Sequence, residues 1–134
     1  MKKNLYRIVD ANLNRAKEGL RVCEDIARYL WNKEALTKSF KGLRHDLTQV
    51  AGTLGILKIL EGRDVHADVG SESSPSELKR KDIAGVFLAN MQRVKESLRV
   101  LEEVSKLLDS KASEGFKKLR YKIYVLEQKA VKKS

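Results

Sequence analysis

A segment of twenty residues occurs twice in this chain, and this repeat limits the possible folds more than any other feature of the sequence. Residues 11–30 are ANLNRAKEGLRVCEDIARYL, and residues 89–108 are ANMQRVKESLRVLEEVSKLL. Ten of the twenty aligned positions are identical. An internal repeat of this kind indicates a duplicated structural unit whose two copies pack together.

Both copies place apolar residues at steps of three and four, the spacing of one face of an α-helix. In the first copy these positions are Leu13, Ala16, Leu20, Cys23, Ala27 and Leu30. In the second copy they are Met91, Val94, Leu98, Leu101, Ser105 and Leu108. Each copy is therefore predicted to be a helix that packs through this face, with Ser105 as its one weak position.

A second amphipathic segment follows each copy. The apolar positions after the first copy are Leu36, Phe40, Leu43, Leu47, Val50, Leu54 and Leu57. After the second copy they are Phe116, Leu119, Ile123, Leu126 and Ala130. Arg44 aligns with Arg120 at an offset of 76 residues, so the duplicated unit is a whole helix–turn–helix. Two such hairpins predict an all-α fold, a four-helix bundle with approximate two-fold symmetry.

Capping residues set the predicted boundaries of the first hairpin. After a short lead-in, Asp10 is expected to cap the first helix, which runs to about Trp31. Asn32 is expected to cap the second helix. Gly52 and Gly55 are expected to weaken or bend the far end of that helix, because glycine is a poor helix former.

The second hairpin is expected to begin at the sequence SPSE, residues 74–77, which combines a capping serine, a proline at the first helical position and a glutamate. The third helix then runs to Leu108, unless it breaks near residues 81–82, and a joint at 109–113 leads to the fourth. The chain is predicted to be one domain, residues 1–134. Its repeat halves are about 10–61 and 75–131, joined by loop 62–74.

The composition narrows the classes of partner. The chain has 28 Lys and Arg against 18 Asp and Glu, and its net charge of +10 favours nucleic acid, acidic membranes or phosphorylated small molecules. The only cysteine, Cys23, lies on the apolar face, so a buried thiol and a reducing cytoplasm are expected. No apolar run approaches the roughly 20 residues of a membrane span. Phosphate-binding loops, dinucleotide-binding glycine patterns and zinc-spaced Cys/His clusters do not occur.

Six polar positions recur in both copies, although a solvated helix face does not need fixed side chains. They are Asn12/Asn90, Arg15/Arg93, Lys17/Lys95, Glu18/Glu96, Arg21/Arg99 and Glu24/Glu102. One interpretation is a duplication that has not yet drifted, with ion pairs along each helix. The other, which we favour, is two equivalent polar surfaces that need particular side chains.

Arginine beside carboxylate is the chemical feature that these positions share. Arginine suits phosphate recognition because its guanidinium is planar and always charged. Neighbouring carboxylates could orient the guanidiniums or hold Mg²⁺ through oxygen ligands. Alternatively, arginine and glutamate simply satisfy each other between helices. From the residues alone, this structural alternative is the stronger one.

Residues 62–73, GRDVHADVGSES, form the one long polar loop of the sequence. Compact domains rarely keep such a loop without a reason, and loops on rigid scaffolds often carry function. The loop holds Arg63, Asp64, His66, Asp68 and Gly70. A plain linker between two duplicated halves explains it equally well.

Five blocks occur in order between about Tyr6 and Glu127: ANLNRAKEGLRVCEDIAR, LRHDL, DVG, ANMQRVKESLRVLEE and KLRYKIYVLE. Together they resemble the monofunctional hydroxymethylpyrimidine-phosphate kinase family, a helical domain often fused ahead of thiamine-phosphate synthase. This chain would be a stand-alone form. The resemblance implies phosphoryl transfer from ATP to 4-amino-5-hydroxymethyl-2-methylpyrimidine phosphate in thiamine biosynthesis, with ATP and Mg²⁺ as cofactors. Such a reaction needs positioning and charge neutralisation more than covalent work by the protein.

The resemblance places the site on its recurring motif positions. The residues expected to bind substrate and phosphate are Asn12, Arg15, Arg21, Arg44, His45, Asn90, Arg93, Arg99, Arg120 and Tyr121. The carboxylates expected to orient them or to hold metal are Glu18, Glu24, Asp25, Asp64, Asp68, Glu96, Glu102 and Glu103. Gly70 would let the loop backbone approach the nucleotide. The metal ligands, and the half that binds ATP, stay open.

Two other functions compete with this hypothesis. A basic helical module for nucleic acid would bind with a steep salt dependence, but the sequence has no recognition motif and only 6% aromatic residues for stacking. A non-catalytic helper that docks on thiamine-phosphate synthase would expose an apolar patch. A homodimer is compatible with these functions, and the sequence does not decide whether the site lies within one chain or across a dimer.

Overall fold

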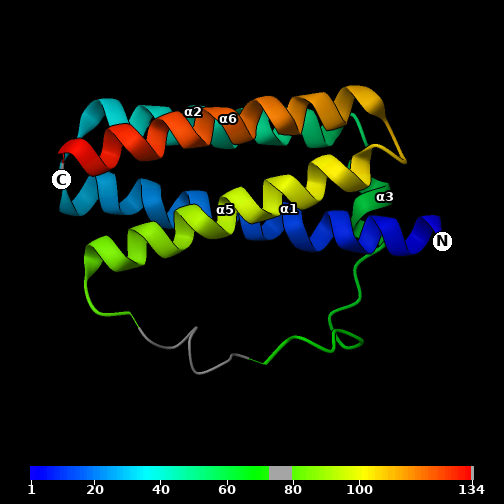
Figure 1. Ribbon diagram of the computed structural model, residues 1–134. Helices are drawn as coiled ribbons and strands as arrows, with labels where there is room; N and C mark the ends of the chain where they lie inside the picture. Colours follow the sequence, from blue (N-terminus) through cyan, green and yellow to red (C-terminus); the bar gives the residue numbers. More distant parts are fainter. Residues whose placement is uncertain (73–79, 134) are drawn as a thin grey trace.

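The computed structural model describes residues 1–72 and 80–133, and all regular secondary structure within them is helical (Figure 1). The elements are α1 (Lys2–Asp25), the π-helical turn η1 (Ile26–Leu30), α2 (Glu34–Gly52), the short α3 (Ile56–Glu61), α5 (Ile83–Ser105) and α6 (Ser110–Lys133). The long helices form a closed ring, because α1 packs against α2 and α5, and α6 packs against α5 and α2. Neighbouring long helices run antiparallel (Figure 1). The predicted all-α bundle is confirmed, whereas its two-fold symmetry stays a prediction.

One hydrophobic core lies inside this ring, and it is built from the predicted apolar faces. Phe40, Phe87 and Phe116 are among its fully buried side chains. Cys23 is fully buried there, and its thiol lies 3.5 Å from the carbonyl oxygen of Phe87. Burial raises the pKa of Cys23 to about 12, so the thiol stays protonated at neutral pH. The predicted buried thiol is confirmed.

Leu30 is a correction to the predicted core, since its side chain is 56% exposed. The chain leaves α-helical register just before it: in the π turn, the Trp31 amide donates to the Ile26 carbonyl five residues back, over 3.0 Å. The extra residue in this turn rotates Leu30 out of the apolar face. Trp31 takes its place, and its ring centroid lies 4.9 Å from that of Phe87.

Two predicted caps are also wrong. The first helix begins at Lys2, so the lead-in is helical and Asp10 lies buried within α1. The second helix begins at Glu34 after Lys33, with no side-chain cap. Asn32 instead adopts a left-handed backbone with φ of 53°, a conformation that asparagine tolerates better than most residues, and it reverses the chain between α1 and α2.

The second helix ends at a glycine, where the sequence predicted only that the helix would weaken or bend. α2 stops at Gly52, and Gly55, whose φ is 89°, precedes the separate helix α3. The predicted apolar face does not continue across this break, because α3 turns Ile59 towards the core instead. Leu57 is consequently 73% exposed, which corrects its assignment to the core.

The second hairpin starts at the end of the bundle opposite to α3 (Figure 1). The predicted start at 74–77 lies outside the described residues, and α5 begins at Ile83, where the Asp82 carboxylate accepts from the Gly85 amide at 2.7 Å. The joint before the last helix is at 106–109 rather than 109–113, because Asp109 caps α6 by accepting from the amides of Lys111 and Ala112. In the ranges that the structure describes, no helix is long and apolar enough to cross a membrane.

Candidate functional site

A cavity of about 890 Å³ lies between the first two thirds of α1 and the loop at 62–72, and we call it the α1–loop cleft. Its polar lining comes from Asn4, Arg7, Asp10, Asn12, Asn14, Arg15 and Glu18 of α1 and from Arg63, Asp64, Asp68 and Ser71 of the loop. Five of the predicted site residues therefore meet here: Asn12, Arg15, Glu18, Asp64 and Asp68. They come from two segments that lie about fifty residues apart in the sequence.

A two-pronged ion pair holds the loop against α1. Arg63 Nε donates to Asp10 Oδ2 and Arg63 Nη2 to Asp10 Oδ1, each over 2.8 Å. The Asp10 carboxylate is nearly buried, and Asn14 donates to it as well, at 3.2 Å. The hydrogen bonds from Arg63 to Asp10 raise the pKa of Arg63 above its ordinary value. Since Arg63 is engaged in this way, its role in the cleft is to position the loop.

Two other guanidiniums in the cleft remain available. Arg7 Nη2 lies 3.5 Å from the Asp64 carbonyl oxygen, and Arg15 Nη1 lies 3.5 Å from Asn12 Oδ1, both at the outer limit of a hydrogen bond. Neither arginine forms an ion pair with any residue in the described ranges. Both could therefore meet an anionic ligand without first breaking a strong contact.

The cleft is mixed in charge. Its three arginines face the four carboxylates of Asp10, Glu18, Asp64 and Asp68. Asp64 Oδ1 accepts from the Ala67 amide and Asp68 Oδ1 from the Gly70 amide, which shapes the loop's own turns. Gly70 does not line the cleft. Such a surface fits a ligand that has both an anionic group and hydrogen-bond donors better than it fits a bare polyanion.

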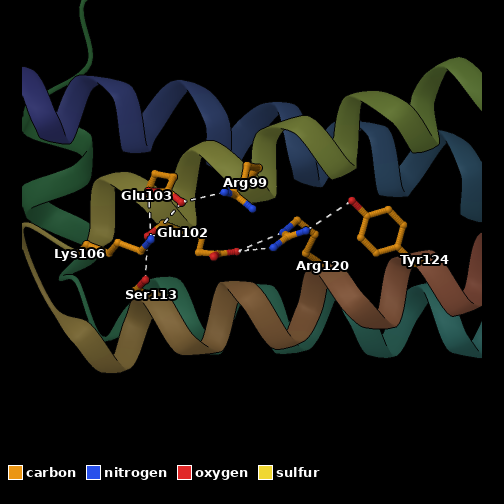
Figure 2. Close-up of polar contacts among 7 residues, drawn as sticks. All are labelled: Arg99, Glu102, Glu103, Lys106, Ser113, Arg120 and Tyr124. Atoms are coloured by element: carbon orange, nitrogen blue, oxygen red, sulfur yellow. Dashed lines mark hydrogen bonds and ion pairs between the residues drawn. The ribbon is translucent and has the colours of Figure 1, made fainter.

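Each hairpin has an ion pair at repeat-equivalent positions, and these pairs involve four of the predicted site residues. Arg44 Nε donates to Glu24 Oε1 at 2.6 Å, between α2 and α1. Arg120 Nε donates to Glu102 Oε1 at 3.1 Å, between α6 and α5 (Figure 2). These residues satisfy each other between helices, as the structural alternative expected, and their contacts hold each hairpin together.

The surroundings of Glu102 reinforce the second pair (Figure 2). Arg120 Nη1 also donates to the Tyr124 hydroxyl at 3.4 Å, and its guanidinium lies 5.1 Å from the ring centroid of Tyr121. The Ser113 hydroxyl donates to the Glu102 carbonyl at 2.8 Å. α5 and α6 are thus joined by several polar contacts around one buried carboxylate.

Three other predicted site residues, Arg21, Arg99 and Glu103, lie on the surface. Arg21 lies 3.4 Å from Glu24 and is 55% exposed, and Arg99 lies 3.2 Å from Glu103 and is 57% exposed. Lys106 also binds Glu103, and its hydrogen bond lowers the pKa of that carboxyl group (Figure 2).

His45, Asp25 and Tyr121 are exposed and do not line the cleft. The second repeat's Asn90, Arg93 and Glu96 lie on α5, also outside the cleft. The two repeats share a local contact even so: Asn12 donates to the Ile8 carbonyl and Asn90 to the Val86 carbonyl, each at 2.9 Å. Equivalent positions thus keep equivalent backbone contacts, but the loop turns only the first repeat's polar face into a cleft.

The carboxylates do not form a metal site made by protein alone. In the part of the chain that the structure describes, no three His, Cys, Asp or Glu residues lie close enough together to hold an ion. Glu24 and Glu102 are already occupied by arginine. Binding of ATP and Mg²⁺ stays a prediction.

The sequence interpretation missed Asn4, Arg7, Asp10 and Asn14. For Asn4 and Arg7 a signal was present: positions 4, 7, 11 and 15 follow one another at steps of three and four, so Asn4 and Arg7 share a helix face with Arg15 if the helix continues towards the N-terminus. The choice of Asp10 as a helix cap concealed this continuity.

Fold and site define a class: a duplicated helical hairpin whose connecting loop closes a polar cleft on the first helix. The chain belongs to the ThiD2 family, whose sequence pattern matches residues 7–129. No solved structure matches it.

Curated relatives place the family in thiamine biosynthesis. A thiamine-phosphate synthase of Thermosynechococcus vestitus is 42% identical over 127 residues, 94% of this chain and 35% of that protein. A thiamine-phosphate synthase of Nostoc punctiforme is 41% identical over 92% of this chain and 34% of its own. That of Rhodopirellula baltica is 37% identical over 91% of this chain and 33% of its own. The chain thus spans about a third of the length of these relatives.

These relatives correct the function expected from the sequence. They bear the name thiamine-phosphate synthase and not that of a kinase, so the assignment of this chain as a hydroxymethylpyrimidine-phosphate kinase is wrong. The relation to thiamine biosynthesis and to thiamine-phosphate synthase is confirmed. The alternative of a nucleic-acid-binding module gains no support from these names.

Proposed function

We propose that this chain serves thiamine-phosphate synthesis as a helical module that binds a phosphorylated aminopyrimidine in the α1–loop cleft. The observation that carries the proposal is the pair Arg7 and Arg15, which have no ion-pair partner in the described ranges and lie beside a loop fixed by Arg63. Family membership supplies the pathway, and the mixed charge of the cleft supplies the class of ligand.

Each part of such a ligand has a complementary group in the cleft. Its phosphate would bind the guanidiniums of Arg7 and Arg15 through charge-assisted hydrogen bonds. Its exocyclic amine is a donor and would find acceptors in the carboxylates of Glu18, Asp64 and Asp68. A cavity of about 890 Å³ is in the range that holds small organic ligands. The proposal is one of binding, and we assign no bond-making step to the chain.

Calorimetric titration with 4-amino-5-hydroxymethyl-2-methylpyrimidine phosphate tests the proposal. The substitution Arg15→Gln removes one charged contact worth about 1.5–3 kcal/mol, so affinity should fall about ten- to hundredfold. Arg93→Gln is the matched control, because Arg93 is the repeat equivalent of Arg15 on α5 but lies outside the cleft. Its affinity should equal that of the unsubstituted chain.

Two results would count against the proposal. One is a folded protein that does not bind the pyrimidine phosphate. The other is equal weakening by Arg15→Gln and Arg93→Gln, which would mean that the ligand responds to overall charge and not to the cleft.

A further inference from the structure

A second cavity, of about 660 Å³, lies between α2 and α6 and shares no residue with the α1–loop cleft. We call it the α2–α6 groove. The residues that matter to its chemistry are Gly42 and Leu43 of α2 and Lys118, Tyr121, Val125 and Lys129 of α6. The proposed function does not use this groove.

The floor of the groove is apolar and open. Leu43 and Leu126 belong to the hydrophobic core and are each 7% exposed. Tyr121 and Val125 stand above them and are 53% and 52% exposed. An exposed apolar patch that adjoins the core and is surrounded by charged side chains often marks an interaction site.

Gly42 shows that the groove is not needed for packing within this chain. A Cβ atom at Gly42 would meet nothing within 4 Å. By contrast, a Cβ atom at Gly115 of α6 would lie 2.8 Å from Val50 Cγ1 of α2, so the same two helices are in close contact there. A glycine inside a helix weakens that helix. No close contact within this chain explains why position 42 is a glycine despite this loss of helix stability.

The rim of the groove is positive. Lys118, Lys122 and Lys129 of α6 line it, against one carboxylate, Asp46, which lies 3.6 Å from Lys122. Lys118 and Lys129 form no ion pair with any residue in the described ranges. A second copy of this chain would bring lysines against lysines, which is unfavourable, whereas an acidic partner would neutralise them.

We propose that the α2–α6 groove docks an acidic amphipathic helix of thiamine-phosphate synthase. Residues 118–129 extend over about 16 Å of α6, which matches three turns of a helix laid in the groove. Its apolar face would cover Leu43, Tyr121 and Val125, and its carboxylates would pair with Lys118 and Lys129. The identity of the partner rests on the proposed function and on relatives that are about three times as long as the matched region.

The experiment measures binding of this full chain to purified full-length thiamine-phosphate synthase of the same organism by biolayer interferometry. Gly42→Leu fills the groove, so affinity should fall at least tenfold while the melting temperature does not fall. Gly52→Leu is the matched control, since a Cβ there also meets nothing within 4 Å but the position lies outside the groove. This control should bind like the unsubstituted chain.

Charge reversal gives a second measurement. Lys118→Glu with Lys129→Glu should abolish docking, while Lys111→Glu with Lys117→Glu, an equal change of net charge on the same helix outside the groove, should weaken it little. Pyrimidine phosphate binding by the Gly42→Leu protein should be unchanged, so failure of docking and failure of the proposed function are distinguishable.

Three outcomes would overturn the docking proposal. The first is that the folded chain does not bind the synthase. The second is that Gly42→Leu and the double substitution of Lys118 and Lys129 leave that binding intact. The third outcome is that the groove variants alter only self-association or binding to an RNA oligonucleotide.

Discussion

Glu102 and Arg120 differ from most ion pairs of this chain because both side chains are withdrawn from water. Their side chains are 7% and 9% exposed, against 45% and 57% for Glu103 and Arg99. Exposed pairs contribute about 0–1 kcal/mol, whereas removal of one partner from a buried pair leaves an uncompensated charge that costs about 3–5 kcal/mol. Stability should therefore depend more on this buried pair than on the exposed pair of Glu103 and Arg99.

We expect Arg120→Met to lower the free energy of unfolding by about 3 kcal/mol, because Glu102 then stays buried without its cation. The double substitution Arg120→Met with Glu102→Leu should recover most of this loss, since no charge remains to be desolvated. Urea unfolding followed by circular dichroism measures both. Arg99→Gln serves as the control and should change stability by less than about 1 kcal/mol. A double variant as unstable as Arg120→Met alone would contradict this account.

At the scale of residues, the sequence showed which side chains recur but not what they contact. Arg44 and Arg120 were correctly identified as a recurring pair, yet their partners lie on another helix, about twenty residues away. Whether such a guanidinium reaches a carboxylate or a ligand depends on how two helices are rotated against each other. Apolar periodicity fixes that rotation only approximately.

The contact of α1 with α5 depends on a glycine. A Cβ atom at Gly19 would lie 2.7 Å from Val94 Cγ2 and 3.1 Å from the Asn90 carbonyl oxygen. The two helices approach closely here, and a β-branched side chain and a backbone atom leave little room to adjust. The repeat equivalent of Gly19 is Ser97, which is buried with its side chain present, so this requirement belongs to one copy only.

Gly19→Ala should therefore destabilise the protein by about 1–3 kcal/mol, although alanine is the better helix former. Gly42→Ala makes the same change where a Cβ meets nothing, and it should stabilise the protein by about 0.5–1 kcal/mol. Thermal unfolding of both variants under one set of conditions gives the comparison. Changes of the same sign in the two variants would show that helix propensity outweighs packing at Gly19.

At the scale of elements, the sequence predicted the four long helices and their buried faces well. It missed the π turn and α3, and the reason is physical. One extra residue in a turn changes the apolar spacing so little that Leu30 fits the pattern as well as Trp31 does. A weakened or bent helix end at Gly52 and Gly55 was expected, but the direction of the six residues of α3 depends on contacts that periodicity does not describe.

At the scale of the whole molecule, the connection between the two hairpins links opposite ends of the bundle. α3 ends at one end of the bundle and α5 begins at the other (Figure 1). The chain between them must therefore cover about the length of α5, whose 23 residues rise about 35 Å. Topology alone thus requires a long connection, and the Asp10–Arg63 pair then attaches its first part to α1.

Arg63→Gln should release this part of the connection without unfolding the bundle, because the Arg63 side chain is 44% exposed and is not part of the hydrophobic core. Hydrogen exchange followed by mass spectrometry should show faster exchange in residues 62–72 and unchanged exchange in α5 and α6. Affinity for the pyrimidine phosphate should fall as well, since the cleft loses one wall. Glu34→Gln, which removes an exposed pair with Lys38, is the control. Unchanged exchange at 62–72 would show that the loop does not depend on Arg63.

For the whole molecule, the fold class followed from the sequence, whereas the position of the cleft did not, and the sequence left open whether the loop was functional or a plain linker. The repeat predicted two equivalent polar faces, one on each copy. The structure brings only the face of α1 together with the loop, because the loop returns along one helix and not the other. Sequence similarity between two halves does not reveal which of them a connection will cover.

The return path of this connection also bears on the history of the protein. A single ancestral hairpin that paired with an identical neighbour would have had no connecting loop beside its first helix. It would therefore have lacked the loop residues that line the cleft opposite Arg7 and Arg15. That side of the cleft exists only once the two genes are joined. If the proposed function holds, the joining of the two hairpins would thus have created the ligand site. Arg15 would then serve a ligand while its equivalent Arg93 remains without one, and Arg7 has no arginine equivalent, because Gly85 occupies that position.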